Sequence, residues 1–235
     1  MPRLGECTWT ELDGSGPRTV LVPVGSLEQH GPHLPLDTDT RIAAAVARRA
    51  AAGDTALLLA PPLAYGASGE HEGFPGTLSI GHEALRGVLV ELGRSAARWA
   101  DRLLFVNGHG GNLPTVPAAV TRLRAEGRDV AWVGCVVPGG DAHAGATETS
   151  ILLALDPDLV RVDALEAGNT APLPELLPLL VRAGVAAASP NGVLGDPRPA
   201  SAAEGERLLG EMVARLRGAL CHWHPDDHGR LQPPS

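Results

Sequence analysis

Carboxylate and imidazole groups, which proteins use to bind divalent metal ions, are concentrated in the segment 25–39: Glu28, His30, His33, Asp37 and Asp39. Glu28 and His30 are two positions apart, so in an extended segment their side chains point the same way. Carboxylate oxygen beside imidazole nitrogen suits Zn²⁺, Mn²⁺ or Fe²⁺ better than Ca²⁺ or Mg²⁺. Taken alone, the cluster is explained equally well as a polar surface loop, because short His/acid clusters recur by chance.

Two later segments carry groups of the same kind. Residues 107–112 read NGHGGN and place His109 in a glycine-rich turn. Glycine permits close backbone approaches, so this histidine can be held rigidly as a ligand, and neither the dinucleotide fingerprint nor the P-loop pattern is present. Residues 141–150, DAHAGATETS, contain His143 and Glu148. His143 is a candidate proton carrier. Glu148 either favours the dipole of a following helix or faces the site as a ligand.

A fourth segment, residues 65–77, reads YGASGEHEGFPGT. We consider Ser68, Glu70 and His71 candidate substrate-binding residues, although an exposed polar lip explains Glu70 and His71 equally well. Asp39 begins a predicted helix, where its carboxylate acts either as an N-cap or as a bridge between two ions.

Each of these segments follows a predicted buried strand. Four short apolar runs predict strands, at 19–24, 57–60, 102–106 and 129–137. Helix-length patterns separate them, at 39–52, 81–100 and 113–126. This alternation predicts βαβ units and a mainly parallel sheet. Because binding sites in such sheets gather beyond the carboxyl ends of the strands, we expect the four polar segments to meet at one edge.

Composition limits the class of protein. The 235 residues are 44 % hydrophobic, enough for one α/β domain with a sizeable core, and we predict a single domain over 1–235. A net charge of −8 and the lack of an Lys/Arg stripe argue against nucleic-acid binding. No apolar run approaches the ~20 residues of a membrane span. Three widely spaced cysteines are typical of reduced thiols in the cytoplasm.

The C-terminal third carries fewer signals. Apolar patterns predict helices over 173–181 and 203–220, with a loop over 184–201 between them. The last stretch contains three histidines within 222–228, but termini are usually frayed. We therefore predict a flexible tail over 222–235 rather than a second metal site.

Taken in order, the polar segments resemble the signature of the creatininase family of metal-dependent amidohydrolases. The resemblance rests on VPVGSLEQHGPHLPL at 22–36 with Asp39, GFPGT at 73–77, NGHGGN at 107–112 and HAGATETS at 143–150. It implies a creatininase-like three-layer α/β sandwich around a mainly parallel sheet. It also implies a homo-oligomer, with a hexamer as the expected form.

The resemblance further implies two divalent metal ions per subunit, Zn, Fe or Mn. Glu28 and His109 would hold one ion, His30 the other, and Asp39 would bridge them. Creatininase takes a further acid from the position of Gly111, so here the acid must come from elsewhere, and Glu148 is our candidate. A water activated by the two ions would attack an amide carbonyl, and His143 would pass a proton to the leaving amine.

Two later segments, GNTAP at 168–172 and SPNGVLGD at 189–196, resemble a peptide-cleaving branch of the family. That branch releases a C-terminal Val-Tyr dipeptide from a modified precursor peptide. Gly110 replaces an aromatic substrate contact of creatininase, and the loop near 140 lacks the tryptophan that closes over creatinine, so the pocket should be more open.

Two other functions remain open. The same site would serve a hydrolase of a small cyclic amide or a formamide. A non-catalytic assembly protein with structural metals is the third reading, but structural zinc sites are usually saturated by four ligands, often thiolates, and no cysteine lies in the cluster.

Overall fold

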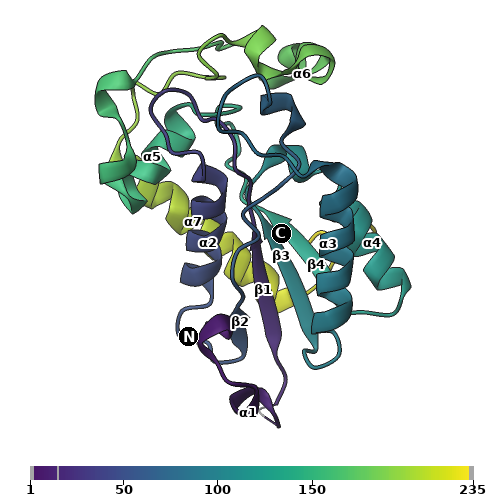
Figure 1. Cartoon of the computed structure of the whole chain (residues 1–235). Helices are drawn as coiled ribbons and strands as arrows, with labels where there is room; N and C mark the ends of the chain where they lie inside the picture. Colours follow the sequence, from purple (N-terminus) through teal and green to yellow (C-terminus); the bar gives the residue numbers. More distant parts are fainter. Residues whose placement is uncertain (1–2, 15, 233–235) are drawn as a thin grey trace.

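A computed structural model of the chain describes residues 3–14 and 16–232. Within those residues a parallel sheet of four strands has the order β2-β1-β3-β4 (Figure 1). The strands are β1 (Thr19–Val24), β2 (Leu57–Leu59), β3 (Arg102–Asn107) and β4 (Val130–Gly134). Val24 pairs with Asn107, and Asn107 pairs with Gly134. The carboxyl ends of β1, β3 and β4 are therefore level, and the segments that follow them leave from the same edge.

Helices cover both faces of the sheet (Figure 1). α3 (Gly81–Ala96) and α4 (Val116–Ala125) cover one face, while α2 (Thr38–Ala50), α5 (Ala146–Leu155) and α7 (Ala202–His222) lie on the other. Alternate strand residues serve the two cores: Val20 and Phe105 belong to the first, Leu21 and Leu104 to the second. This alternation is the period-2 pattern of a strand buried on both faces. The prediction of a three-layer α/β sandwich is confirmed.

The other elements are shorter or lie outside these layers. They are α1 (Trp9–Leu12), α6 (Leu173–Ala188) and the 3₁₀ turns η1 (Leu4–Glu6), η2 (Gly69–His71), η3 (Gly110–Asn112), η4 (Pro157–Leu159) and η5 (Val162–Ala164). α6 lies beyond the sheet, at the top of the molecule in Figure 1. Among the described helices, none combines the length and apolar character that a membrane span requires.

Two helices begin at places that the sequence pattern did not predict. α4 starts at Val116 rather than at 113, because Gly110–Asn112 form η3 and because Pro114 and Pro117 have no backbone N–H with which to hydrogen-bond a longer helix. α5 starts at Ala146 and so includes Glu148, whereas the sequence analysis expected a helix that follows Glu148. The Asp141 carboxylate accepts hydrogen bonds from the backbone N–H groups of Ala146 (2.7 Å) and Thr147 (2.9 Å), and so caps its first turn.

The region 184–201, predicted as a loop, is helical at its start. α6 continues to Ala188, with a break at Gly184, whose φ of 74° favours glycine. The sequence analysis predicted that this helix ends at 181, because Gly184 interrupts the helical pattern of apolar residues.

The C-terminal segment also differs from the predicted flexible tail. Trp223 and Leu231 are buried, and the Trp223 indole donates a 2.8 Å hydrogen bond to Asp129 Oδ1. Trp132, on β4, donates from its side chain to His228 O (3.0 Å). Residues 223–232 therefore pack beside β4, the strand at one edge of the sheet. Residues 233–235 lie outside the described residues.

Candidate metal centre

Two asparagines tie together the segments that follow β1, β2 and β3. Asn112 Nδ2 donates to Gly25 O (3.0 Å) and Asn107 Oδ1 (3.1 Å), and its Oδ1 accepts from Ala67 N (2.9 Å). Asn107 in turn donates to His109 O at 2.7 Å. These bonds fix the three segments relative to one another. The sequence analysis gave neither asparagine a role, and their places at the two ends of NGHGGN were the available signal.

Two glycines let the start of α2 approach the ends of β1 and β3. A Cβ on Gly108 would lie 2.4 Å from Asp39 O, and a Cβ on Gly25 would lie 2.5 Å from Thr40 Cα. A side chain at either position would push the helix away. Because neither position carries a side chain, the helix can place the buried Asp39 carboxylate at the carboxyl edge of the sheet.

Glu28, Asp39 and His109 form the first group of potential ligands, and all three are buried. His109 Nδ1 lies 3.1 Å from Asp39 Oδ2, and His109 Nε2 lies 3.1 Å from Glu28 Oε2. Ser26 Oγ donates a 2.6 Å hydrogen bond to Asp39 Oδ2 and holds that carboxylate in place. The sequence analysis did not identify Ser26.

His30, His143 and Glu148 form a second group. His30 Nε2 lies 3.2 Å from Asp39 Oδ1 and 3.9 Å from Glu148 Oε2. Ala144 N donates to the same Glu148 oxygen at 2.6 Å, which fixes its orientation. Asp39 thus presents one oxygen to each group, as a bridging carboxylate would.

Glu28 provides the test of whether these residues fit a metal ion. Its side chain is 0 % exposed, and neither carboxylate oxygen has a hydrogen-bond partner within the described part of the chain. A buried carboxylate without such partners is costly unless a positive charge compensates it. Mixed carboxylate and imidazole donors are the set that Zn²⁺, Mn²⁺ and Fe²⁺ accept, so the residues fit a divalent cation.

The electrostatics of the two groups also favour a positive charge. Although burial opposes it, Asp39 raises the pKa of His30 to about 10. Burial likewise opposes the rise for His109, but Glu28 and Asp39 raise its pKa to about 9. Burial raises the pKa of Glu28 to about 7. Without a cation, therefore, the groups hold extra protons, which a metal ion would displace.

Gln29 positions two further histidines beside Glu28. Its Nε2 lies 3.0 Å from His143 Nε2 and 2.9 Å from His71 Nδ1. His143 Nδ1 and His71 Nε2 lie 3.9 Å and 3.3 Å from Glu28 Oε1. Burial holds the pKa of His143 well below its usual range and lowers that of His71 to about 3. Both imidazoles are therefore neutral. The sequence analysis did not identify Gln29 as a residue that positions them.

The structure distinguishes among the candidate residues of the segment 65–77. Ser68 and His71 are buried, so the reading of His71 as part of an exposed lip is wrong. Ser68 Oγ lies 3.5 Å from His109 Nε2, and Glu70 Oε1 lies 3.6 Å from the same nitrogen.

Two candidates from the segment 25–39 lie away from the ligand groups. His33 Nε2 lies 2.8 Å from Thr149 Oγ1, and Asp37 accepts a 2.7 Å hydrogen bond from Arg41 Nε. These contacts support the neighbouring helices rather than the centre.

A cleft of about 780 Å³ opens onto the centre. His109 and Glu148 line it, together with Gly110, Gly139 and Gly140. Its walls are mainly apolar and include Ile42, Leu113, Val136, Val137, Ile151, Ala171, Pro172, Leu173 and Leu194. The volume is in the range of small-ligand sites.

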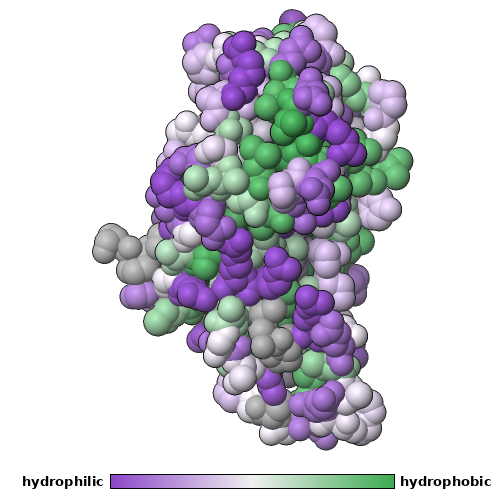
Figure 2. Space-filling view, turned by 90° about the vertical axis from the view of Figure 1, so that its left-hand side faces the viewer, coloured by the Kyte–Doolittle hydropathy of each residue, from purple (hydrophilic) through white to green (hydrophobic). Residues whose placement is uncertain are grey.

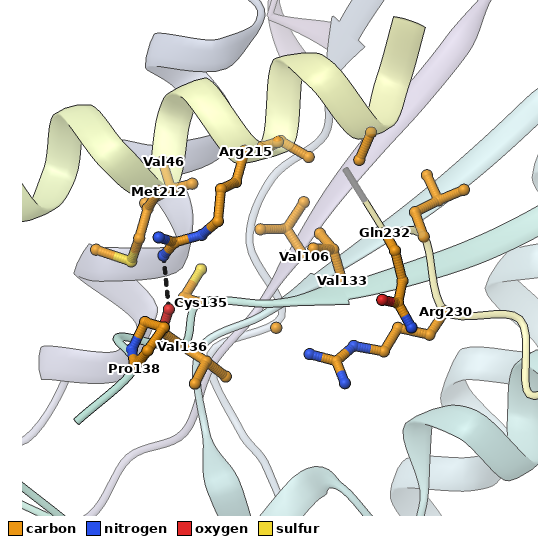
Figure 3. Close-up of a pocket in the computed structure, with 14 residues that line it drawn as sticks. Val46, Val106, Val133, Cys135, Val136, Pro138, Met212, Arg215, Arg230 and Gln232 are labelled. Carbon is orange, nitrogen blue, oxygen red and sulfur yellow. Dashed lines mark hydrogen bonds between the residues drawn. The ribbon is translucent and has the colours of Figure 1, made fainter. Parts of the chain in front are cut away.

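A smaller cavity of about 170 Å³ lies between α7 and the end of β4 (Figure 3). There Arg215 donates a 2.7 Å hydrogen bond to Val136 O. None of the residues in the two ligand groups lines this cavity, so we assign the chemistry to the larger cleft.

Comparison with known proteins agrees with this geometry. The model of the family described as "Creatininase: Creatinine amidohydrolase" matches residues 5–220. The chain is 59 % identical to the mycofactocin precursor peptide peptidase of Mycolicibacterium smegmatis over 233 residues, covering 97 % of this chain and 94 % of that protein. Two solved creatininases, one described with Mn and one as a Zn-Zn type variant, superpose with a TM-score of 0.79 at 30 % and 31 % identity. Each comparison covers 94 % of this chain and 98 % of the other.

Proposed function

Since the chain belongs to the creatininase family of metal-dependent amidohydrolases, we propose that it releases the C-terminal Val-Tyr dipeptide from a modified mycofactocin precursor peptide. It is a metal-dependent hydrolase of C–N bonds. One observation carries the proposal furthest. The candidate metal ligands lie close together, and two of them, His109 and Glu148, line an apolar cleft in a chain 59 % identical to a peptidase of that name.

Two divalent ions, Zn, Mn or Fe, would be held by residues of the two groups other than His143. Glu28 and His109 would bind one ion, His30 and Glu148 the other, and Asp39 both. When bound, such ions polarise an amide carbonyl and acidify water.

The chain's own residues would orient the substrate and move protons. His143 is neutral and buried, and its ring nitrogens lie beside Glu28 and Gln29. A neutral imidazole accepts a proton at one nitrogen and then donates it, so His143 would deliver a proton to the departing amine. Gln29 fixes the ring, because its backbone carbonyl lies 2.8 Å from His143 Nε2.

The shape and charge of the cleft support a peptide substrate. Gly110, Gly139 and Gly140 leave space where larger side chains would close it. Valine and tyrosine side chains match the apolar walls. Among the residues that line the cleft, Asp141, Glu148 and Asp196 are acidic, and none is a lysine or an arginine. This charge disfavours a free terminal carboxylate and suits a peptide whose terminal tyrosine has been decarboxylated.

We also propose that the protein is a homo-oligomer, with a hexamer as the expected form. α6 is apolar nearly all round, and Leu173, Leu177 and Val181 form an exposed stripe at helical spacing. A helix of this kind is normally buried on more than one side. Figure 2 shows that the main apolar patch on a neighbouring face also lies in the upper half of the molecule, where Figure 1 places α6.

The test is to incubate metal-loaded protein with the decarboxylated, crosslinked precursor peptide and to measure the products by mass. We expect released dipeptide, with no comparable turnover of creatinine or of a formamide, and loss of turnover after chelation. Hydrolysis of creatinine or the formamide with an untouched peptide would contradict the proposed substrate.

A further inference from the structure

We propose that Glu70 is an additional metal-binding residue, which adds a third carboxylate to the group of Glu28, Asp39 and His109. This inference rests on the proposed function in one respect only, that a divalent ion binds in that group. It gives Glu70 a role other than the substrate contact or exposed lip expected from the sequence.

The first observation is where the Glu70 carboxylate lies. Its Oε1 is 3.6 Å from His109 Nε2, and a Cβ built on Gly111 would lie 2.3 Å from the same oxygen. The Glu70 carboxylate therefore fills the space beside His109 that a side chain at position 111 would occupy. Gly111 lacks that side chain, and so the carboxylate reaches the centre from a different loop.

The second observation is an excess of oxygen around one nitrogen. Glu28 Oε2, Ala67 O, Ser68 Oγ and Glu70 Oε1 lie at 3.1, 3.2, 3.5 and 3.6 Å from His109 Nε2. A ring nitrogen carries at most one hydrogen, and carboxylate and carbonyl oxygens only accept. One proton cannot satisfy two carboxylates and a carbonyl, whereas a divalent cation can.

The third observation comes from Glu28. Its two oxygens are buried and without hydrogen-bond partners among the described residues, and one of them faces the same His109 nitrogen as Glu70. Glu70 is a third carboxylate, beside Glu28 and Asp39, around the single ring of His109. Carboxylates this close repel one another unless further positive charge is present. The arrangement is therefore that of a cation site.

The backbone around Glu70 is fixed, so the carboxylate is not simply a mobile surface group. His71 N donates to Ser68 O at 3.0 Å within the turn η2, and the His71 side chain is anchored by Gln29 and Glu28. On the other side, α6 packs on this turn at Gly184, where a Cβ would lie 2.8 Å from Glu70 O. Held from both sides, the Glu70 side chain is only 30 % exposed.

The experiment compares Glu70→Gln with Glu72→Gln in the full chain. Both changes remove one negative charge from the same loop, but Glu72 is exposed and serves as the matched control. Binding of Mn²⁺ and Zn²⁺ is titrated into metal-free protein without substrate, and the visible absorption of the Co²⁺-loaded form reports the ligand set.

We expect Glu70→Gln to weaken the binding of one ion at least about tenfold and to change the Co²⁺ spectrum, because even residues that only support a metal ligand affect affinity about 10–100-fold. Glu72→Gln should match the unmodified protein. Unchanged dissociation constants and an unchanged spectrum in Glu70→Gln would overturn the inference. If Glu70→Gln does not fold, the metal dissociation constants of Glu70→Asp are measured instead. They should also be raised, because the shorter side chain holds its carboxylate farther from the ion.

The result is independent of the peptide assay. If the unmodified protein binds metal but leaves the precursor intact, the proposed substrate fails while the Glu70 comparison remains decisive. If the peptide is cleaved and Glu70→Gln binds metal normally, only the role of Glu70 is refuted.

Discussion

His143 differs from the other imidazoles of the centre in what surrounds it. Burial keeps its ring neutral, and it contacts the backbone and side chain of Gln29 as well as the edge of Glu28. A residue that moves protons can be removed without releasing the ions, whereas a residue that binds an ion cannot. This difference gives the first prediction.

His143→Ala should keep its metal content and lose turnover by about 10²–10⁴, the usual effect of removing a proton-transfer group. Metal content by elemental analysis and kcat on the precursor peptide are the two measurements. His222→Ala, which removes an exposed histidine on α7, is the control and should match the unmodified enzyme. Full activity in His143→Ala would refute the assigned role.

Asp39 is the residue on which both ligand groups depend, because one oxygen faces His109 and the other faces His30. Asp39→Asn should therefore reduce the binding of both ions together and abolish turnover. Asp37→Asn is the matched control, since Asp37 binds Arg41 and lies outside the ligand groups. Loss of a single ion in Asp39→Asn would show that this carboxylate does not bridge.

At the scale of elements, the strands could be predicted from the sequence, whereas the contacts that hold the candidate ligands in place could not. Thr19–Val24 was predicted to the residue, because a buried parallel strand is a continuous apolar run. β4 ends at Gly134 rather than 137, because β3 ends beside it at Asn107. Residue type and spacing made Glu28, His30, Asp39 and His109 candidate ligands, and these side chains lie within 3.2 Å of one another in sequence-distant pairs such as Asp39 and His109.

The contacts of Gln29, Ser26 and Glu70 were not predictable in the same way. Each joins segments that are distant in sequence, such as Gln29 with His143, and no local pattern encodes such a contact. The packing of Trp223 against Asp129 is another case, because the C-terminal segment has neither helix nor strand periodicity.

α5 and α7 meet at a glycine, which gives a prediction about stability. A Cβ on Gly205 would lie 1.8 Å from Ser150 O, so Gly205→Ala must separate the two helices. We expect a loss of about 1–3 kcal/mol in the free energy of unfolding, the usual cost of overpacking. Gly210→Ala, on the same helix with nothing within 4 Å of its Cβ, should gain about 0.5–1 kcal/mol. Urea denaturation measures both, and similar values for the two variants would contradict the proposed contact.

Glu126 links α3 to the end of α4, and its effect should depend on pH. Hydrogen bonds from Arg94, with further help from Arg122, lower the pKa of Glu126 from 4.5 to about 2. A carboxyl group with a lowered pKa in the folded state stabilises the protein above its unfolded pKa. That contribution is lost as the pH falls from about 4.5 to about 2.

Glu126→Gln should therefore lower Tm slightly at pH 7, by about 1–3 °C, because exposed ion pairs contribute little. The difference between the two proteins should shrink as the pH falls below about 4.5, and also at high salt. Thermal melts across pH 2–7 check this, and a difference that grows toward low pH would contradict it.

At the scale of the whole molecule, α6 connects the cleft with the outer surface. Leu173, at its first turn, lines the cleft, and Gly184, near its end, packs on the turn that carries Glu70. Between them the exposed stripe continues through Leu177 and Val181, which are 51 % and 81 % exposed. Contact with a second copy along this stripe would hold both the wall of the cleft and the Glu70 turn in place.

Leu177→Glu combined with Val181→Glu should therefore reduce the molecular mass in solution, because burying each apolar side chain contributes about 1.5–3 kcal/mol and a buried charge opposes contact. Val88→Glu with Leu92→Glu is the matched control. These residues have the same spacing on α3 and are 38 % and 40 % exposed. Light scattering after size-exclusion chromatography measures the mass, and circular dichroism confirms that each variant is folded. An unchanged mass in the α6 variant, or an equal fall in both, would show that this stripe is not the contact between subunits.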